Sequence, residues 1–199
     1  RGCTAEGAEC VVSADVSAVN NTSQAATTIH AIYSLALKGG TTTVVDQELK
    51  ASFGGDLTLA GGTISAEQAN SKVAINVDGD ITINTNFSTN NISELTLNST
   101  GNVKINCAVA TCNNININAK GYIWIMSGGN FKDLYAQDYI KLELNTKAQN
   151  LYSLGSTELW SGASAQNINA VGNVKVQEAS VKKVSGVGGN IYSNGEVYL

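Results

Sequence analysis

The chain has 199 residues, 43% hydrophobic and 14% charged, with 20 glycines and no proline; its polarity comes mainly from Asn, Ser, Thr and Gly. This composition is typical of strands and turns and excludes a helical bundle. The net charge is −4, from 12 Lys and Arg against 16 Asp and Glu. No basic run and no long apolar run is present, so neither a nucleic-acid partner nor a membrane span is predicted.

Residues 1–30 show no clear repeat, and we expect them to form an irregular N-terminal coil or a cap. Within residues 23–38, Ile29, Ile32, Tyr33 and Ala36 lie at helical spacing and are followed by two glycines, so a short capping helix is the alternative. His30 is the only histidine. It lacks a Ser, Cys or carboxylate pattern around it, which favours a surface or capping role.

The four cysteines fall into two close pairs, Cys3 with Cys10 and Cys107 with Cys112. Short disulfide loops are typical of oxidising compartments, so we expect two local disulfides and an exported protein. The first residue is arginine rather than methionine, which fits a processed start. Four reduced thiols in a cytosolic protein are the alternative, and three disulfide connectivities are formally open.

The strongest signal is an internal repeat. Rows that begin at Gly55, Gly79, Gly101, Gly121, Asp138, Gly155, Gly172 and Gly189 are spaced by 24, 22, 20, 17, 17, 17 and 17 residues. The residues two and four positions after each start are mostly aliphatic, from Leu57 and Leu59 onward. A third aliphatic column lies four residues before the following start and lapses at Ser185. We place a further row at 31–54, with Tyr33 and Leu35 in the first two columns.

Apolar and polar residues alternate within a row, as in Val73, Ile75 and Val77, and the alternation continues through the row-start glycine. Two short strands that meet at a glycine corner explain this pattern, because a missing Cβ permits the bend. The sequence therefore predicts an all-β fold. Residues 31–199 are expected to form a single-stranded parallel β-helix (a β-solenoid), right-handed by default, with about 8–9 coils of about 17–24 residues.

The segments GDLTLAGGTISA, GDITINTN and GNVKINCA resemble the repeats of filamentous-haemagglutinin-type secreted β-helix adhesins of bacteria. The 17-residue coils are similar in size to those of bactofilin filaments. The resemblance covers residues 31–199 and implies a bacterial surface or filament-forming protein. The chain departs from both groups: bactofilins are cytosolic and lack paired cysteines, and the adhesins are usually far longer, with an N-terminal secretion domain that is not recognisable here.

Two sets of outward residues are candidates for contacts along the rod. Three residues before the row starts stand Asn76, Asn98, Asn118, Tyr135, Tyr152 and Asn169, which predict a ladder of stacked amides that passes into a tyrosine pair. The outward aromatic residues Tyr122, Trp124, Tyr139 and Trp160 predict a strip that meets a partner subunit or a sugar ring. The alternative is that a larger loop or the N-terminal segment covers these rings.

No catalytic, metal or cofactor site is predicted. Polysaccharide-degrading β-helix enzymes need clustered carboxylates together with Arg, Lys or calcium, and here the only arginine is Arg1. The best acidic group is Asp56, Asp78 and Asp80, for which we prefer solvated side chains at the corners over a weak calcium site. No nucleophile motif, phosphate loop or zinc spacing is present, so the protein is not expected to be an enzyme.

Rows that start at Gly55, Gly79 and Gly101 carry 7, 5 and 3 residues more than 17, and these insertions are expected to stack into a tapering shelf. Candidate N-glycosylation sequons begin at Asn20, Asn21, Asn86, Asn91 and Asn98.

The C-terminal residues alternate in polarity and lack a proline or a cap, so the last coil is expected to expose an open sheet edge. The predicted assembly interface consists of Gly189, Asn190, Ile191, Tyr192, Val197, Tyr198 and Leu199. It is expected to pair with the N-terminal region of another copy and to give a head-to-tail filament. The alternative is that the chain is a fragment of a longer adhesin, whose next coil covers this edge. The predicted function is that of a secreted structural protein at the cell surface. An adhesin stalk, or a head that binds cell-surface polysaccharide, is the second reading, and a polysaccharide-degrading enzyme is the third.

Overall fold

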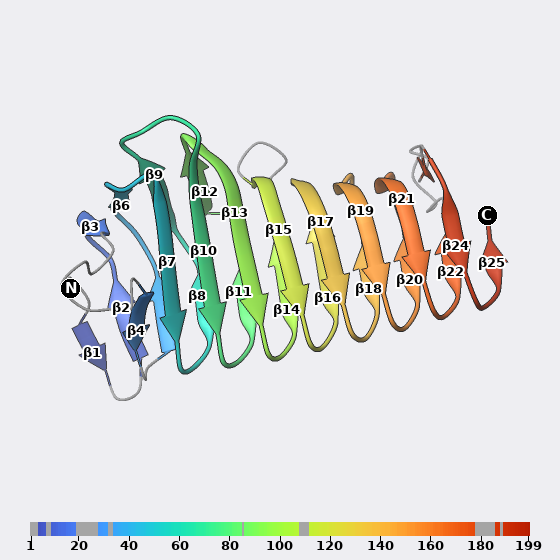
Figure 1. Cartoon of the computed structure of the whole chain (residues 1–199), viewed down its shortest axis with the longest axis horizontal. Coiled ribbons are helices and arrows are strands. Elements are labelled where there is room, and N and C mark those ends of the chain that lie inside the picture. The colour runs from blue at the N-terminus through green and yellow to red at the C-terminus, as the bar shows by residue number, and fades with distance from the viewer. Residues whose placement is uncertain are drawn as a thin grey trace.

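The computed structural model describes residues 4–6, 9–18, 28–31, 34–84, 86–107, 112–177, 186–187 and 189–199. The described residues contain 25 strands and no helix. Successive turns of chain stack side by side along a rod, with the N-terminal strands at one end and the C-terminal strands at the other (Figure 1). The predicted parallel β-solenoid is confirmed.

The first sheet has 11 strands and runs the length of the rod. Its only antiparallel pairing is that of its first two strands, β1 with β2. In spatial order the strands are β1 (Thr4–Glu6), β2 (Glu9–Val12), β5 (Ser34–Leu37), β8 (Leu57–Leu59), β11 (Ile81–Ile83), β14 (Val103–Asn106), β16 (Ile123–Ser127), β18 (Ile140–Leu142), β20 (Thr157–Leu159), β22 (Val174–Val176) and β25 (Val197–Tyr198).

The second sheet faces the viewer in Figure 1. It consists of β4 (Thr28–Ala31), β7 (Glu48–Phe53), β10 (Ser71–Val77), β13 (Ile92–Ser99), β15 (Asn113–Ala119), β17 (Asn130–Ala136), β19 (Lys147–Ser153) and β21 (Ser164–Ala170), with β23 (Gly186–Val187) and β24 (Ile191–Ser193) both paired to β21. A third sheet of four strands covers only the N-terminal part: β3 (Val16–Ala18), β6 (Thr41–Val44), β9 (Gly62–Ala66) and β12 (Phe87–Asn90). The extra residues of the coils that start at Gly55 and Gly79 include β9 and β12 of this sheet, whereas the described part of the coil that starts at Gly101 adds no strand to it.

The register confirms the aliphatic columns. Ile81 lies opposite Leu57 and Val103 in the first sheet, and Ile75 lies opposite Leu97 in the second. These side chains fill the space between the sheets, and most of the column members from Leu57 to Val174 are 0% exposed. Burial of aliphatic surface along the whole rod is the main stabilising contribution.

The predicted register is wrong in the row at 31–54. Leu35 pairs with Leu57 and Leu37 with Leu59, so Leu35 and Leu37 occupy the first two columns and this coil spans 22 residues, not 24. Tyr33 lies outside the described residues. An alternating sequence looks the same after a shift of two residues, so the pattern cannot select between these registers. The capping helix is also wrong where it can be seen, since β4 and β5 are strands.

The last predicted row is wrong as well. Ile191 pairs with Ile168 in the second sheet, and Val197 pairs with Val174 in the first, so the corner glycine of the last coil is Gly195 rather than Gly189. The coil is 23 residues long. Gly189 stands 17 residues after Gly172, the same spacing as between the preceding row starts, and this led to the wrong prediction. With Gly195 as the start, Ile191 falls into the third column, where the predicted register had placed Ser185.

Candidate functional site

The corner after each row-start glycine carries a ladder of side-chain acceptors. Asp56 Oδ1 accepts a hydrogen bond from the backbone N–H of Asp80 (2.8 Å), and Asp80 Oδ1 accepts one from Asn102 N–H (2.8 Å). Asn102 Oδ1 continues the ladder to the N–H of Tyr122 (3.0 Å). Each coil thus satisfies a backbone donor of the next coil at the bend.

The same ladder explains the corner glycines. A Cβ at Gly79 or Gly101 would overlap the carboxylate oxygen of Asp56 or Asp80 from the preceding coil. The predicted acidic group is therefore a structural corner, and the third carboxylate, Asp78, accepts a hydrogen bond from the Thr100 hydroxyl (3.0 Å). Among the residues that the structure describes, no group of three or more His, Cys, Asp or Glu side chains is placed to hold a metal ion.

The four predicted aromatic residues lie on the first-sheet side but do not form one strip. Tyr122 and Tyr139 occupy the corner position of adjacent coils, where they replace the Asp and Asn ladder. Their rings stack with centroids 4.9 Å apart and an interplanar angle of 5°. Both rings are half-buried.

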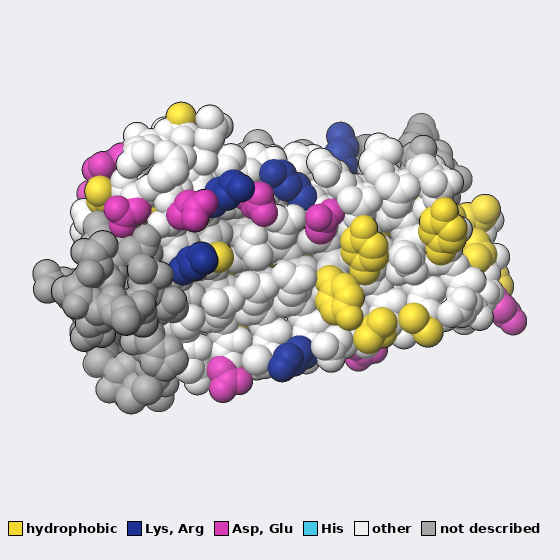
Figure 2. Space-filling view, viewed as in Figure 1, with side chains coloured by type: hydrophobic (Ala, Val, Ile, Leu, Met, Phe, Trp, Pro, Cys, Tyr) yellow, Lys and Arg dark blue, Asp and Glu magenta, His cyan; other side chains and the backbone are white. Residues whose placement is uncertain are grey.

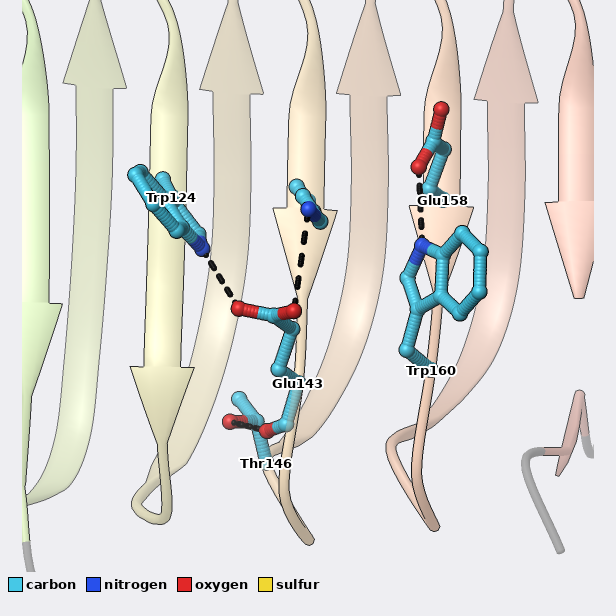
Figure 3. A network of polar contacts seen from close by, with 6 residues as sticks. Trp124, Glu143, Thr146, Glu158 and Trp160 are labelled. Atoms are coloured by element: carbon cyan, nitrogen blue, oxygen red, sulfur yellow. Dashed lines mark hydrogen bonds and ion pairs between the residues drawn. The ribbon is translucent and has the colours of Figure 1, made fainter. Parts of the chain in front are cut away.

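Trp124 and Trp160 lie two coils apart, with the coil of Lys141 and Glu143 between them (Figure 3). The indole N–H of Trp124 donates to Glu143 (2.7 Å), and that of Trp160 donates to Glu158 (2.8 Å). Lys141 Nζ lies 3.6 Å from the other carboxylate oxygen of Glu143. The polar atom of each indole is therefore satisfied within the chain.

Lysines from the coils before and after each tryptophan approach its ring. Lys104 Nζ and Lys141 Nζ lie 5.1 and 5.3 Å from the Trp124 ring centroid. Lys141 and Lys175 lie 5.8 and 5.1 Å from that of Trp160. Such cation–π contacts contribute about 0.5–1 kcal/mol each at exposed sites. These lysine–tryptophan contacts link consecutive coils, and both tryptophan side chains are half-buried.

The stacked tyrosines give the rod an alkaline sensitivity. Burial, followed by the charges of Tyr122, Asp138 and Glu158, raises the pKa of Tyr139 above its ordinary value of 10.0. Because the pKa of Tyr139 is higher in the folded protein than in the unfolded chain, the protonated phenol stabilises the fold. This stabilisation is complete below the pKa of the unfolded chain, and it is lost as the pH rises through the pKa of the folded protein. We therefore expect unfolding free energy to fall above pH 10, and the fall to be smaller in Tyr139→Phe.

Urea unfolding between pH 8 and 11, with absorbance titration of the phenolates, measures this effect. Tyr122→Phe is the matched variant, since it removes one of the charges that raise the pKa of Tyr139 and should lower that pKa. An identical pH dependence in the wild type and in Tyr139→Phe would contradict the prediction.

The outer face of the second sheet carries the predicted amide ladder. Asn98 Nδ2 donates to Asn76 Oδ1 (2.7 Å), and Asn118 Nδ2 donates to Asn98 Oδ1 (2.7 Å). Tyr135 and Tyr152 follow in register.

A second ladder on this face was not predicted. It joins Asn116 to Asp133, Asp133 to Asn150 and Asn150 to Asn167, with bonds of 3.0, 2.8 and 3.0 Å. Its members recur every 17 residues, the spacing of the rows themselves, so the signal was present in the sequence.

The predicted assembly residues lie at the C-terminal end of the rod on two different sheets. Ile191 and Tyr192 belong to β24, and Val197 and Tyr198 belong to β25. Gly189 and Asn190 precede β24 and are exposed, and the Asn190 N–H donates to Asn167 Oδ1 (3.1 Å). Exposed fractions are 63% for Tyr192, 45% for Val197, 48% for Tyr198 and 89% for Leu199. Within the described chain, β25 pairs with β22 alone.

Cys107 and Cys112 form a disulfide between β14 and β15, with a Cα–Cα distance of 6.0 Å, and both are fully buried. Cys10 is also disulfide-bonded. Its predicted partner, Cys3, lies outside the described residues.

The sequons differ in their surroundings. Asn20 and Asn21 lie outside the described residues, whereas Asn86 and Asn91 are exposed on the third-sheet side. Asn98 lies within β13, one residue before its end, and its amide nitrogen donates to Asn76, which is a poor acceptor geometry for a glycan.

In the described part of the chain, no helix has the length and apolarity needed to cross a membrane. Comparisons of the chain with protein-family models, with curated proteins and with solved structures found no match. The relationship to secreted β-helix adhesins and bactofilins therefore stays a prediction that rests on the repeat pattern.

Proposed function

We propose that the protein is a secreted structural subunit that assembles head to tail into an extracellular filament. The observation that carries the proposal is the edge of β25. In each preceding coil, the residue two positions after the corner donates its N–H to the next coil, as Thr157 does to the carbonyl of Asn173 and Val174 to that of Glu196 (both 2.9 Å). Val197 occupies the same position in the last described coil and directs its N–H away from β22, to the edge at which a further coil would add.

The two ends of the rod offer different surfaces. Among the described residues, the C-terminal end presents β25 and β24 with the exposed side chains of Tyr192, Val197 and Tyr198, and the N-terminal end presents the edges of β1 and β4. Contact between unlike ends does not close on itself and therefore propagates as a filament. Open strand edges with apolar side chains are the usual template for such pairing.

The remaining features fit a structural role better than an enzymatic one. The corner carboxylates accept backbone hydrogen bonds, and the two tryptophans are engaged by lysines and glutamates of the same chain. The buried Cys107–Cys112 disulfide supports an oxidising, extracellular setting.

Substitution of Val197 by proline tests the proposal. The N–H and the carbonyl of Glu196 both form hydrogen bonds on the β22 side, so the N–H of Val197 points to the other side of β25. Proline at position 197 removes this N–H and leaves the pairing with β22 intact. Val197→Thr is the matched control, because it keeps the N–H. We expect the wild type and Val197→Thr to form filaments with rising concentration in negative-stain electron microscopy and sedimentation, and Val197→Pro to give single rods.

The melting temperature of Val197→Pro should match that of the wild type, since the substituted strand contributes little to the core. Wild-type protein that stays monomeric at every concentration would refute head-to-tail assembly. Unchanged filaments from Val197→Pro would refute the role of the β25 edge.

A further inference from the structure

The second sheet carries a groove on its outer face that filament assembly does not use. The groove has a volume of about 340 Å³ and runs across four consecutive coils, from β10 to β17. Asn76, Asn98, Asn118, Lys120, Tyr135 and Gln137 line it. This volume lies within the range of ligand-binding sites, about 300–1,000 Å³.

The amides in the groove retain hydrogen-bonding capacity toward solvent. A side-chain amide has two N–H donors and two acceptor lone pairs. Asn98 uses one donor toward Asn76 and one acceptor toward Asn118, both along the rod axis. One donor and one acceptor of Asn98 are thus left for a ligand, and the ladder holds the amide in a fixed orientation.

The groove continues into an aromatic and aliphatic platform at the C-terminal end of the same face (Figure 2). Tyr152 is 41% exposed and Tyr192 is 63% exposed, and both lie in register with the ladder position of Asn118. Leu154 and Val171, 50% and 49% exposed, flank them. These are the large hydrophobic side chains that face solvent along the body of this sheet.

The charge of the face restricts what it can bind. Lys120 is the one charged residue among those that line the groove, and the platform residues Tyr152, Leu154, Val171 and Tyr192 are uncharged. Elsewhere on this face basic and acidic side chains lie interspersed (Figure 2), so an anionic or cationic polymer would find no row of charges of a single sign. An uncharged ligand with many hydroxyl groups and apolar ring faces meets both kinds of surface, since amides bond hydroxyls and tyrosine rings pack against apolar ring faces.

We propose that this face binds a neutral polysaccharide chain laid along the rod axis. The amide ladder bonds its hydroxyl groups, and Tyr135 and Tyr152 stack on its sugar rings. The groove is open to solvent rather than enclosed, which suits an internal stretch of a polysaccharide better than a buried chain end. This site lies on the opposite sheet from Trp124 and Trp160.

Affinity electrophoresis and titration calorimetry with amylose, galactomannan, arabinoxylan and mixed-linkage β-glucan test the proposal, with alginate as the anionic comparison. The measurements use Val197→Pro rods, so the result is independent of assembly. We expect at least one neutral polysaccharide to bind, and Tyr152→Ala to weaken that binding about tenfold, as truncation of an aromatic anchor does. Tyr152→Phe keeps the ring and should retain most of the affinity.

Trp160→Ala is the matched control on the first sheet and should bind as the parent does. Absence of binding to every neutral polysaccharide, or stronger binding to alginate, would overturn the proposal. Loss of binding in Trp160→Ala but not in Tyr152→Ala would place the sugar site on the first sheet and also overturn it. Concentration-dependent dimers of Val197→Pro rods that Tyr152→Ala abolishes would assign the face to a second copy instead.

Discussion

Replacement of Ile123 by alanine is expected to lower the free energy of unfolding by about 2–5 kcal/mol, the range for deletion of a large aliphatic side chain in a core. Ile123 is 0% exposed and lies opposite Val103 and Ile140 in adjacent coils. The cavity sits in the middle of the rod, where each coil is stabilised only by its two neighbours. The substitution therefore weakens both interfaces of the central coil.

Urea unfolding monitored by circular dichroism measures this loss. Ile191→Ala is the matched control, because Ile191 is half-buried and, within the described residues, its strand β24 pairs with β21 alone. Its cost should be clearly smaller. An equal loss of unfolding free energy in the two variants would mean that the interior of the rod is packed no better in its central coils than in its last coil, in disagreement with the structure.

Substitution of Gly101 by alanine is expected to destabilise the rod by about 1–3 kcal/mol, the usual cost of overpacking. The φ angle of Gly101 is not in the left-handed region, so the backbone itself accepts alanine. The cost arises from the Asp80 carboxylate, which the new Cβ would overlap. Displacement of this carboxylate also breaks its bond to the N–H of Asn102 (2.8 Å).

A double-mutant cycle separates these causes. Asp80→Ala alone should cost about 0.5–1.5 kcal/mol, the net value of one hydrogen bond. In that background Gly101→Ala should cost clearly less than it does alone, because the remaining close atom, the carbonyl oxygen of Gly79 at 3.1 Å from the added Cβ, has to shift by only a few tenths of an ångström. Additive losses would show that the glycine is required for another reason. At Gly172 the closest atoms are backbone atoms of Gly155, at 2.8 Å, so no side-chain deletion can relieve Gly172→Ala.

The central coils could be predicted because each row carries several independent signals. Between Gly55 and Gly172 the row starts, which are glycines except for Asp138, agree with the aliphatic columns, and the register confirms these columns from Leu57 to Val174. At both ends only one or two of these signals remain. There the period-two alternation allowed a shift by two residues at Leu35, and the repeated 17-residue spacing favoured Gly189 over Gly195.

The surface was less predictable than the lumen. Outward positions were assigned correctly for Asn76, Asn98 and Asn118, because identical residues recur in one column. Trp124 and Trp160 were expected to stand in one strip with the tyrosines, but their surroundings depend on Lys141 and Glu143 from the intervening coil. Trp124, for example, donates its indole N–H to Glu143, which lies 19 residues away in the sequence.

The sequence by itself determined the parallel β-solenoid and the identity of its aliphatic columns, because a local alternation of polarity forces every coil to bury the same face. The tertiary structure decided the register of the first and last coils, the engagement of the two tryptophans and the position of the groove beside Tyr135. These features arise from contacts between coils, where the free energy depends on which side chains meet across the stack rather than on the order of residues within one coil.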